Sequence, residues 1–239
     1  MRPIQLKKSP IVDSICDMRF DSSLPLDIVP GVIVNALNSL EIKDLQKLPV
    51  LEMPESMRAA DPNLLYAPYY HAKIGDITIQ LGGRMIALSS PLPYIGWDSF
   101  RPQITDIIRV ILDTAVISKV VRVAIRNVNF FGLDILDNSK YSIQTPIEHS
   151  CSQYHYTDYY NDGDLTIKTT IANKAIRHES ESEPVEGSVI DIDSYIEDSI
   201  DANLDIMLSK IDKAHLEGKN VFFDLLNDEF IETLEPIYD

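Results

Sequence analysis

The sequence predicts an α+β fold built on a mainly antiparallel sheet, and three observations lead to this prediction. Several segments alternate apolar and polar residues with the period of two that half-buried strands show. A few longer segments repeat their apolar residues with helical spacing. The predicted strands come in runs and do not alternate regularly with helices, which disfavours a doubly wound parallel sheet.

The first half is expected to follow the order β-α-β-β-α-β. Pro30 and Pro102 fit only the first turns of the two helices, and Gly82-Gly83 permits the positive φ angles of a tight hairpin turn. The expected elements are a strand at 11–20, a helix at 27–40, strands at 71–81 and 84–90, a helix at 99–117 and a strand at 119–131.

The second half is expected to hold antiparallel strands followed by C-terminal helices. Gly218 is expected to end the first of these helices as its C-cap residue, which would place His215 near the negative end of the helix dipole, where protonation is favoured. The expected elements are strands at 140–148, 151–160, 164–172 and 187–196, a helix at 201–216 and a helical stretch at 222–234.

One domain over residues 1–239 is expected, with two sub-lobes at 1–133 and 134–239 as the alternative division. A chain of this length suits one large domain or two small ones. The acidic loop at 179–186 joins two predicted strands of one sheet, because the segment after it is too short to build a core of its own.

Charge is distributed very unevenly along the chain. The net charge is −16, and residues 179–239 contain 18 Asp and Glu against only three Lys. Such a surface repels phosphate backbones and anionic membranes, so general nucleic-acid binding and membrane binding are not expected. Two interpretations stay open, a solvated face that confers solubility and a docking face for a partner with a basic surface.

The N-terminal segment lacks the apolar stretch of a signal peptide, since Asp13, Asp17 and Arg19 interrupt the first hydrophobic run. No uncharged apolar run approaches the roughly 20 residues that span a bilayer. A cytoplasmic location is therefore expected.

Two groups of residues resemble metal or acid–base sites. His149, Cys151 and His155 have ligand chemistry, but on one continuous strand Cys151 and His155 would lie about 13 Å apart, too far for a single zinc ion unless the chain turns between them. Asp191 and Asp193 share one strand face about 6–7 Å apart, a spacing that suits a hard cation, an acid–base pair or an ordinary half-exposed strand. Neither group is assigned a metal, a cofactor or a catalytic role.

Further polar and aromatic residues cluster in the sequence. Asp13, Asp17 and Arg19 form a cross-strand charge set, and Arg122 and Arg126 share a strand face, while Cys16 lies on the buried side of its strand as a core thiol. Arg84 and Arg101 are two more members of a potential anion site, and the favoured alternative is that the four arginines pair with the many acids of the chain. Five tyrosines suit either a structural sheet face or a binding surface: Tyr141, Tyr154, Tyr156, Tyr159 and Tyr160.

The chain resembles a sporadically distributed family of uncharacterised bacterial proteins of about 240–260 residues. The blocks that carry the resemblance are Ser9–Phe20, Pro93–Phe100, Arg122–Asn127, Ile190–Asp193 and Phe222–Leu234. The resemblance implies a single architectural unit and an accessory role such as defence or a toxin-partner module, and it supplies no activity. It marks Trp97, Phe100, Arg126 and Asn127 as positions to examine.

No P-loop, dinucleotide-binding, nucleophile-elbow or zinc-protease motif is present. The sequence therefore predicts an interaction protein, more plausibly than an enzyme, that binds a macromolecular partner through its acidic C-terminal part. The alternative is a small-ligand-binding domain or hydrolase whose cavity is closed by the C-terminal helix. The candidate partner-binding residues are Asp191, Asp193, Tyr154, Tyr156, Asp201 and Asp205.

Overall fold

The computed structural model describes residues 2–141, 152–178 and 183–238. Its strands are β1 (Gln5–Leu6), β2 (Ile11–Asp21), β3 (Lys43–Lys47), β4 (Pro68–Ile74), β5 (Ile77–Gly82), β6 (Met85–Pro91), β7 (Lys119–Phe131), β8 (His155–Asp162), β9 (Leu165–Arg177), β10 (Val185–Ile200) and β11 (Pro236–Ile237). Its α-helices are α1 (Val29–Leu37), α2 (Glu55–Ala60), α3 (Pro62–Leu65), α4 (Trp97–Asp113), α5 (Leu204–Leu225) and α6 (Asp228–Thr233).

Nine strands form one sheet in the order β3-β4-β5-β6-β2-β7-β10-β9-β8, and the small pair β1–β11 holds the two chain ends together. Neighbouring strands of the large sheet pair antiparallel. This confirms the predicted α+β class with a mainly antiparallel sheet.

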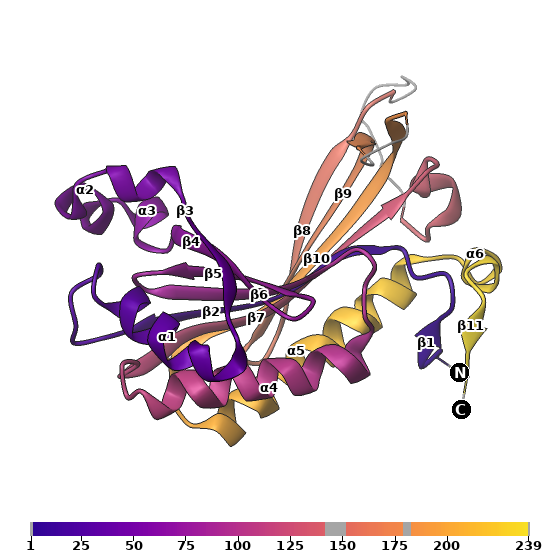
Figure 1. Ribbon diagram of the computed structural model, residues 1–239. Coiled ribbons are helices and arrows are strands. Elements are labelled where there is room, and N and C mark those ends of the chain that lie inside the picture. Colours follow the sequence, from indigo (N-terminus) through magenta and orange to yellow (C-terminus); the bar gives the residue numbers. More distant parts are fainter. Residues whose placement is uncertain (1, 142–151, 179–182, 239) are drawn as a thin grey trace.

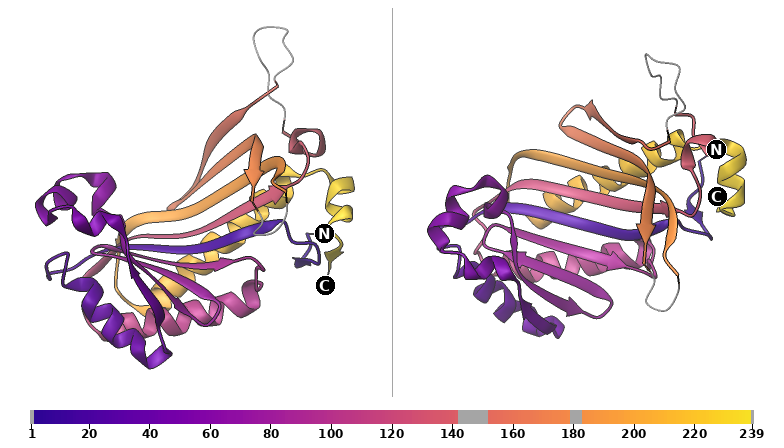
Figure 2. Two further views of the ribbon diagram at one scale, coloured as in Figure 1. Left: turned by 45° about the horizontal axis from the view of Figure 1, so that its top comes forward. Right: turned by 90° about the horizontal axis from the view of Figure 1, so that it is seen from above.

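The long helices cover one face of the sheet and leave most of the other face open. Figures 1 and 2 show α1, α4 and α5 below the sheet, whereas α2 and α3 lie above its β3–β4 edge. Inward-facing residues of the strands and the apolar stripes of the helices form one continuous core, which includes Phe20, Ile33, Ile107, Ile125 and Ile192. Alternation in the strands therefore sorts their residues into a helix-covered face and an open face.

The strand order is symmetric about the central pair β2–β7. Moving outwards, β6, β5 and β4 follow on one side, and β10, β9 and β8 follow on the other. Each set of three strands is followed in the chain by a long helix, α4 or α5. The halves differ at the edges, because β3 pairs with β4 whereas β8 is itself an edge strand of the sheet.

The expected hairpin around Gly82-Gly83 differs from the observed strands. The predicted strand at 71–81 turns at Gly75-Asp76, where Gly75 has φ 55°, so it contributes to both β4 and β5. Gly82 and Gly83 do not adopt positive φ. They are needed for space instead, since a Cβ at Gly82 would lie 2.4 Å from the carbonyl oxygen of Ala67.

Helix boundaries also differ from expectation. α4 begins at Trp97, which places Pro102 in its second turn, and it ends at Asp113, shortly before Ala115 takes a left-handed φ of 52°. α5 starts at the cap residue Asn203 and runs through Gly218 to Leu225, so Gly218 lies inside the helix and is not its C-cap. The long packed face of α5 outweighs the low helix propensity of one glycine.

Three expected segments fall partly outside the described residues, one of them the strand expected at 151–160, of which residue 151 is not described. Of the strand expected at 140–148, only residues 140 and 141 are described, and residues 179–182 of the acidic loop are likewise outside. The last two residues of that predicted loop, Val185 and Glu186, already belong to β10.

Candidate functional site

A network of ion pairs crosses the open face of the sheet at its centre. Arg122 on β7 pairs with Asp17 on β2 and donates to both carboxylate oxygens of Asp193 on β10, at 3.0 and 2.8 Å. Its guanidinium also lies 4.6 Å from the ring centre of Tyr195. The Arg122 side chain is only 8% exposed. The predicted charge set on the first strand therefore extends across three strands.

A second pair lies beside the first. Arg126 donates to the two carboxylate oxygens of Asp191 at 2.8 and 2.6 Å, and Asp13 accepts a hydrogen bond from Ser89. Burial raises the pKa of Asp13 and of Asp17 above its ordinary value, against the opposing effects of the Ser89 hydroxyl and of Arg122.

These ion pairs determine the structural role of Asp191 and Asp193. Arg126 engages Asp191 bidentately through two nitrogens, whereas one terminal nitrogen of Arg122 contacts both oxygens of Asp193, so both carboxylates are held in charge pairs. Among the described residues, no group of three or more His, Cys, Asp or Glu side chains is arranged to hold a metal ion. Of the predicted metal group, His149 and Cys151 lie outside the described residues, and His155 is exposed on β8.

The edge strand β8 presents a regular row of aromatic and acidic side chains. Tyr156, Asp158, Tyr160 and Asp162 alternate along the side that faces α5, as their pairing with Ile171, Thr169, Ile167 and Leu165 of β9 requires. Tyr159 points to the opposite, open face. Tyr159 and Tyr160 are 57% and 59% exposed. We call Tyr156, Asp158, Tyr160 and Asp162 the β8 row.

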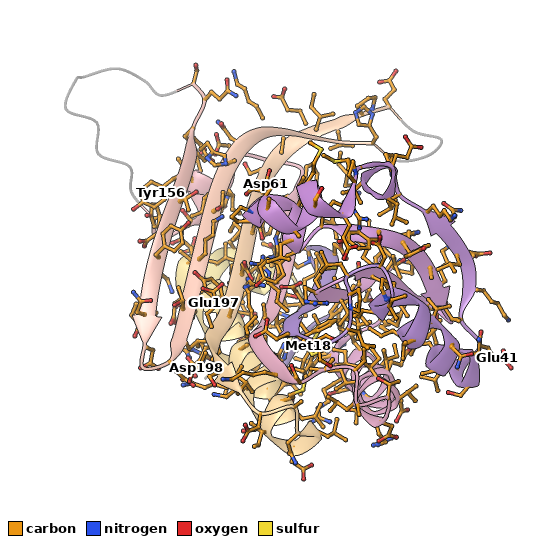
Figure 3. All side chains as sticks on the ribbon, turned by 90° about the vertical axis from the view of Figure 1, so that its left-hand side faces the viewer. Met18, Glu41, Asp61, Tyr156, Glu197 and Asp198 are labelled. Carbon is orange, nitrogen blue, oxygen red and sulfur yellow. The ribbon has the colours of Figure 1, made fainter. Side chains whose placement is uncertain are left out.

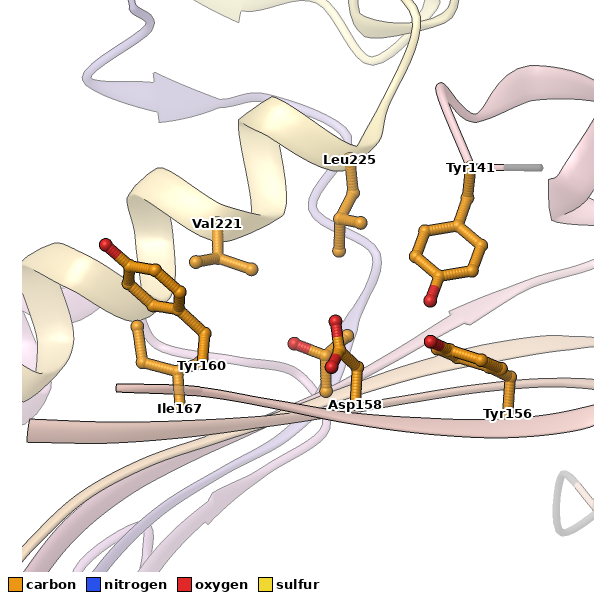
Figure 4. Close-up of a pocket in the computed structure, with 8 residues that line it drawn as sticks. Tyr141, Tyr156, Asp158, Tyr160, Ile167, Val221 and Leu225 are labelled. Atoms are coloured by element: carbon orange, nitrogen blue, oxygen red, sulfur yellow. The ribbon is translucent and has the colours of Figure 1, made fainter. Parts of the chain in front are cut away.

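Part of the β8 row borders a small slot beneath α5. The cavity measures about 80 Å³ and is lined by Tyr141, Tyr156, Asp158, Tyr160, Ile167, Thr169, Val221 and Leu225. Figure 4 shows the Asp158 carboxylate between Tyr160 on one side and Tyr141 with Tyr156 on the other, below Val221 and Leu225. The rings of Tyr141 and Tyr156 lie 4.8 Å apart at 58°. Burial, the Tyr156 hydroxyl and the Asp158 charge all raise the pKa of Tyr141.

Acidic residues gather where the row ends. The β8–β9 turn brings Asp162 and Asp164 next to the β10–α5 junction, because Leu165 pairs with Ile196, and Figure 3 shows Glu197 and Asp198 at that end of the sheet. Lys210 and Lys213 bind Asp164 at 2.9 and 2.7 Å, beside a surface hollow of about 460 Å³ that Asp205 also lines. We call the following residues the acidic tip: Asp162, Asp164, Glu197, Asp198, Asp201 and Asp205.

The predicted partner-binding residues thus separate into four environments. Asp191 and Asp193 are in the ion-pair network, whereas Tyr156 lines the slot, and Asp201 and Asp205 are exposed at the acidic tip. Tyr154 is buried, and its hydroxyl donates to Asp134 at 2.5 Å. Burial, followed by the Asp134 carboxylate, raises the pKa of Tyr154 to about 12.

Of the four residues marked by the resemblance, Phe100 lies in the core, Trp97 and Asn127 are half-buried, and Arg126 is exposed. Phe100 is fully buried, and Asn127 accepts a hydrogen bond from Ser14 at 2.7 Å. Trp97 begins α4 and stacks on His215 of α5, with ring centres 3.7 Å apart and planes 4° apart. Three of the matching blocks coincide with the adjacent central strands β2, β7 and β10.

His215 corrects a sequence-based prediction. It lies in the middle of α5 and not near the end of the helix, and burial lowers its pKa to about 4. Protonation is therefore disfavoured, contrary to expectation. Cys16 is buried as predicted, and burial raises its pKa.

Arg84 and Arg101 do not join the other two predicted arginines. Arg84 donates to the carbonyl oxygens of Gly83, Ser22 and Leu24, and Arg101 pairs with Asp212 on α5 at 2.8 Å. The four arginines therefore serve separate local contacts.

The density of tyrosines was evident in the sequence, but the β8 row was not predicted. In the sequence, every second residue from Tyr156 to Asp162 is in turn a tyrosine or an aspartate. In a strand, this spacing places both residue types on one face. The contribution of α5 to the slot could not be predicted from the sequence, because Val221 and Leu225 follow the glycine at which the helix was expected to end.

No family model matches the chain, and a search of curated proteins found no match either. Within the described parts of the chain, none of the helices has both the length and the apolar character needed to cross a membrane. The resemblance to a bacterial family stays a prediction.

Proposed function

We propose that this chain is an interaction protein that binds a protein partner with a basic surface, using the β8 row and the acidic tip as one docking face. The observation that carries the proposal is the alternating row of tyrosines and aspartates on an exposed edge strand, leading directly into the acidic tip. The accessory role that the resemblance implies and the expected cytoplasmic location belong to the same proposal.

The two parts of this face supply different contributions to binding. Exposed tyrosines bury large areas with little loss of conformational freedom and are frequent energetic centres of interfaces. Carboxylates at the acidic tip attract a basic partner over about a Debye length and speed its encounter. The same charges repel nucleic-acid backbones, which favours a protein as the partner.

The proposal assigns Asp191 and Asp193 a different role from the one expected. Each is already engaged by an arginine, so its charge is largely neutralised within the sheet. By contrast, Asp162, Asp198, Asp201 and Asp205 make no ion pair within 4 Å in the described part of the chain. These four acids of the acidic tip therefore keep a charge that Asp191 and Asp193 do not.

Photo-crosslinking in the organism that encodes the chain tests this proposal. A crosslinking p-benzoylphenylalanine replaces Tyr160 on β8 in one variant and Met57 on α2 in a matched control, since these side chains are similarly exposed at 59% and 54%. We expect Tyr160, but not Met57, to crosslink to a protein of basic isoelectric point. Raising salt from about 0.05 M to about 0.5 M should reduce the yield several-fold, because exposed charges are then screened.

Equal crosslinking from both positions would contradict a docking face on β8. An acidic partner, or a yield that is insensitive to salt, would contradict the electrostatic part of the proposal. The combined variant Asp198→Asn/Asp201→Asn/Asp205→Asn should reproduce the effect of high salt at low salt.

A further inference from the structure

The slot between β8 and α5 combines three features that suit one kind of ligand. Tyrosine rings stand on two sides of a carboxylate, and aliphatic side chains close the top. Tyr141 and Tyr156 point their hydroxyl oxygens toward Asp158 (Figure 4); hydroxyl oxygens accept hydrogen bonds from an ammonium group, and the carboxylate supplies the opposite full charge. A negative pocket with apolar walls favours an organic cation over an anion or a strongly hydrated metal ion.

The charge of Asp158 is not neutralised in the described part of the chain. No Lys, Arg or His side chain lies within ion-pairing distance of it there. Among the described residues, the backbone N–H of Tyr159 donates to it at 2.7 Å, which leaves further acceptor positions on the carboxylate. Asp158 and Tyr160 are exposed, so the slot can be entered from solvent.

The size of the slot restricts the ligand further. Its volume of about 80 Å³ is well below the roughly 300–1,000 Å³ of sites that enclose whole metabolites. It exceeds the roughly 30 Å³ that one water molecule occupies in the liquid. This volume suits the end of a flexible side chain, such as an ammonium group with its adjoining methylenes.

We propose that this slot binds the alkylammonium group of a lysine-type side chain, unmodified or methylated, that a basic partner inserts between Tyr156 and Tyr160 beside Asp158. The inference rests on the proposed function for the source of the side chain. It adds a defined point of recognition to a face that otherwise attracts basic partners only by general charge.

Small probes test the slot without the partner. The full chain with ¹³C-labelled tyrosine rings is titrated with N-acetyl-lysine amide and with choline, and ring shifts are followed by NMR. The neutral controls of matching shape are N-acetyl-norleucine amide and 3,3-dimethylbutan-1-ol. We expect saturable shifts of the rings lining the slot with the cations, and at least about fivefold weaker binding of the neutral analogues. Tighter binding of choline would indicate a methylated ammonium, and tighter binding of the lysine amide an unmodified one.

Two pairs of variants separate the slot from general charge. Asp158→Asn and Tyr160→Ala should each weaken cation binding about fivefold or more. Asp162→Asn on the same strand and Tyr159→Ala on the opposite strand face should change it less than twofold, and circular dichroism would verify that all four variants fold.

Equal binding of cations and neutral analogues, equal effects of Asp158→Asn and Asp162→Asn, or no saturable shift would each overturn the inference. If crosslinking from Tyr160 still captured a basic partner in that event, the proposed function would stand without the slot. If the probes bound but no basic partner crosslinked, the proposed docking face would be wrong.

Discussion

Trp97 and His215 lie face to face where α4 meets α5, and the packing of the two helices buries the imidazole. Burial lowers the pKa of His215 to about 4, and the positive charge of Lys219 adds to the effect. The unfolded chain has no such constraint, so its histidine takes up a proton near pH 6.5. Folding and protonation of this residue therefore oppose each other.

A pH dependence of stability follows. His215 contributes its full stability above about pH 6.5, and the contribution is lost as the pH falls towards 4, because only the unfolded state then binds the proton. The loss should be on the order of 2–3 kcal/mol by pH 4. Urea denaturation followed by the fluorescence of the single tryptophan measures it.

His215→Phe keeps an aromatic ring against Trp97 and removes the titration. This variant should lose less unfolding free energy than the wild type between pH 6.5 and 4, whereas the control His155→Gln on exposed β8 should behave as the wild type does. Identical slopes for the wild type and His215→Phe would contradict the account.

At the scale of elements, Gly218 is the point where α5 crosses β10 most closely. A Cβ at this position would lie 2.6 Å from the Oγ of Ser194 and 3.5 Å from its Cβ. The Ser194 hydroxyl is buried and has no hydrogen-bond partner among the residues that the structure describes. The glycine therefore serves close packing, although a glycine near a predicted helix end favoured a cap.

Gly218→Ala should destabilise the protein by about 1–3 kcal/mol, because overpacking outweighs the better helix propensity of alanine. Ser194→Ala removes the clashing and unpaired oxygen, so the double variant Ser194→Ala/Gly218→Ala should recover most of the loss. Denaturation midpoints of the two single variants and the double variant measure this coupling. Additive effects of the two substitutions would rule out the contact as the cause.

Some strands could be predicted from the local sequence pattern, and others could not. The alternation in residues 11–20 and the β-branched run in 119–131 predicted β2 and β7 nearly to the residue, because half-buried strands impose a period of two. The turn at Gly75-Asp76 was missed, although the apolar positions change parity there, from Ala72 and Ile74 to Ile77 and Ile79. β3 lacked a signal altogether, because all five of its residues are exposed.

At the scale of the whole molecule, two halves with the same strand order share one sheet. The sequences of the halves show no convincing repeat, yet the strand order is the same on both sides of β2–β7. Arg122 bridges this seam, since it binds Asp17 in one half and Asp193 in the other. The halves should therefore unfold together.

Arg122→Met should cost about 3–5 kcal/mol of unfolding free energy, because it leaves two largely buried carboxylates without their partner. The triple variant Arg122→Met/Asp17→Asn/Asp193→Asn should recover much of this loss. Denaturation followed by Trp97 fluorescence and by circular dichroism should give coincident transitions.

The control is Arg126→Met, which breaks a pair whose arginine is 46% exposed and should cost no more than about 1 kcal/mol. Equal losses in the two variants, or separate transitions by the two probes, would argue against a shared cooperative sheet.

The amino-acid order alone determined the fold class, the strand faces and the excess of acid near the C-terminus, because periodicity and charge are local properties of a chain. Only the tertiary structure decided which acids keep their charge. Asp191 and Asp193 meet arginines from a neighbouring strand, while Asp158 meets tyrosines and α5. Pairing across strands joins residues far apart in sequence, and a pattern read along the chain does not contain those distances.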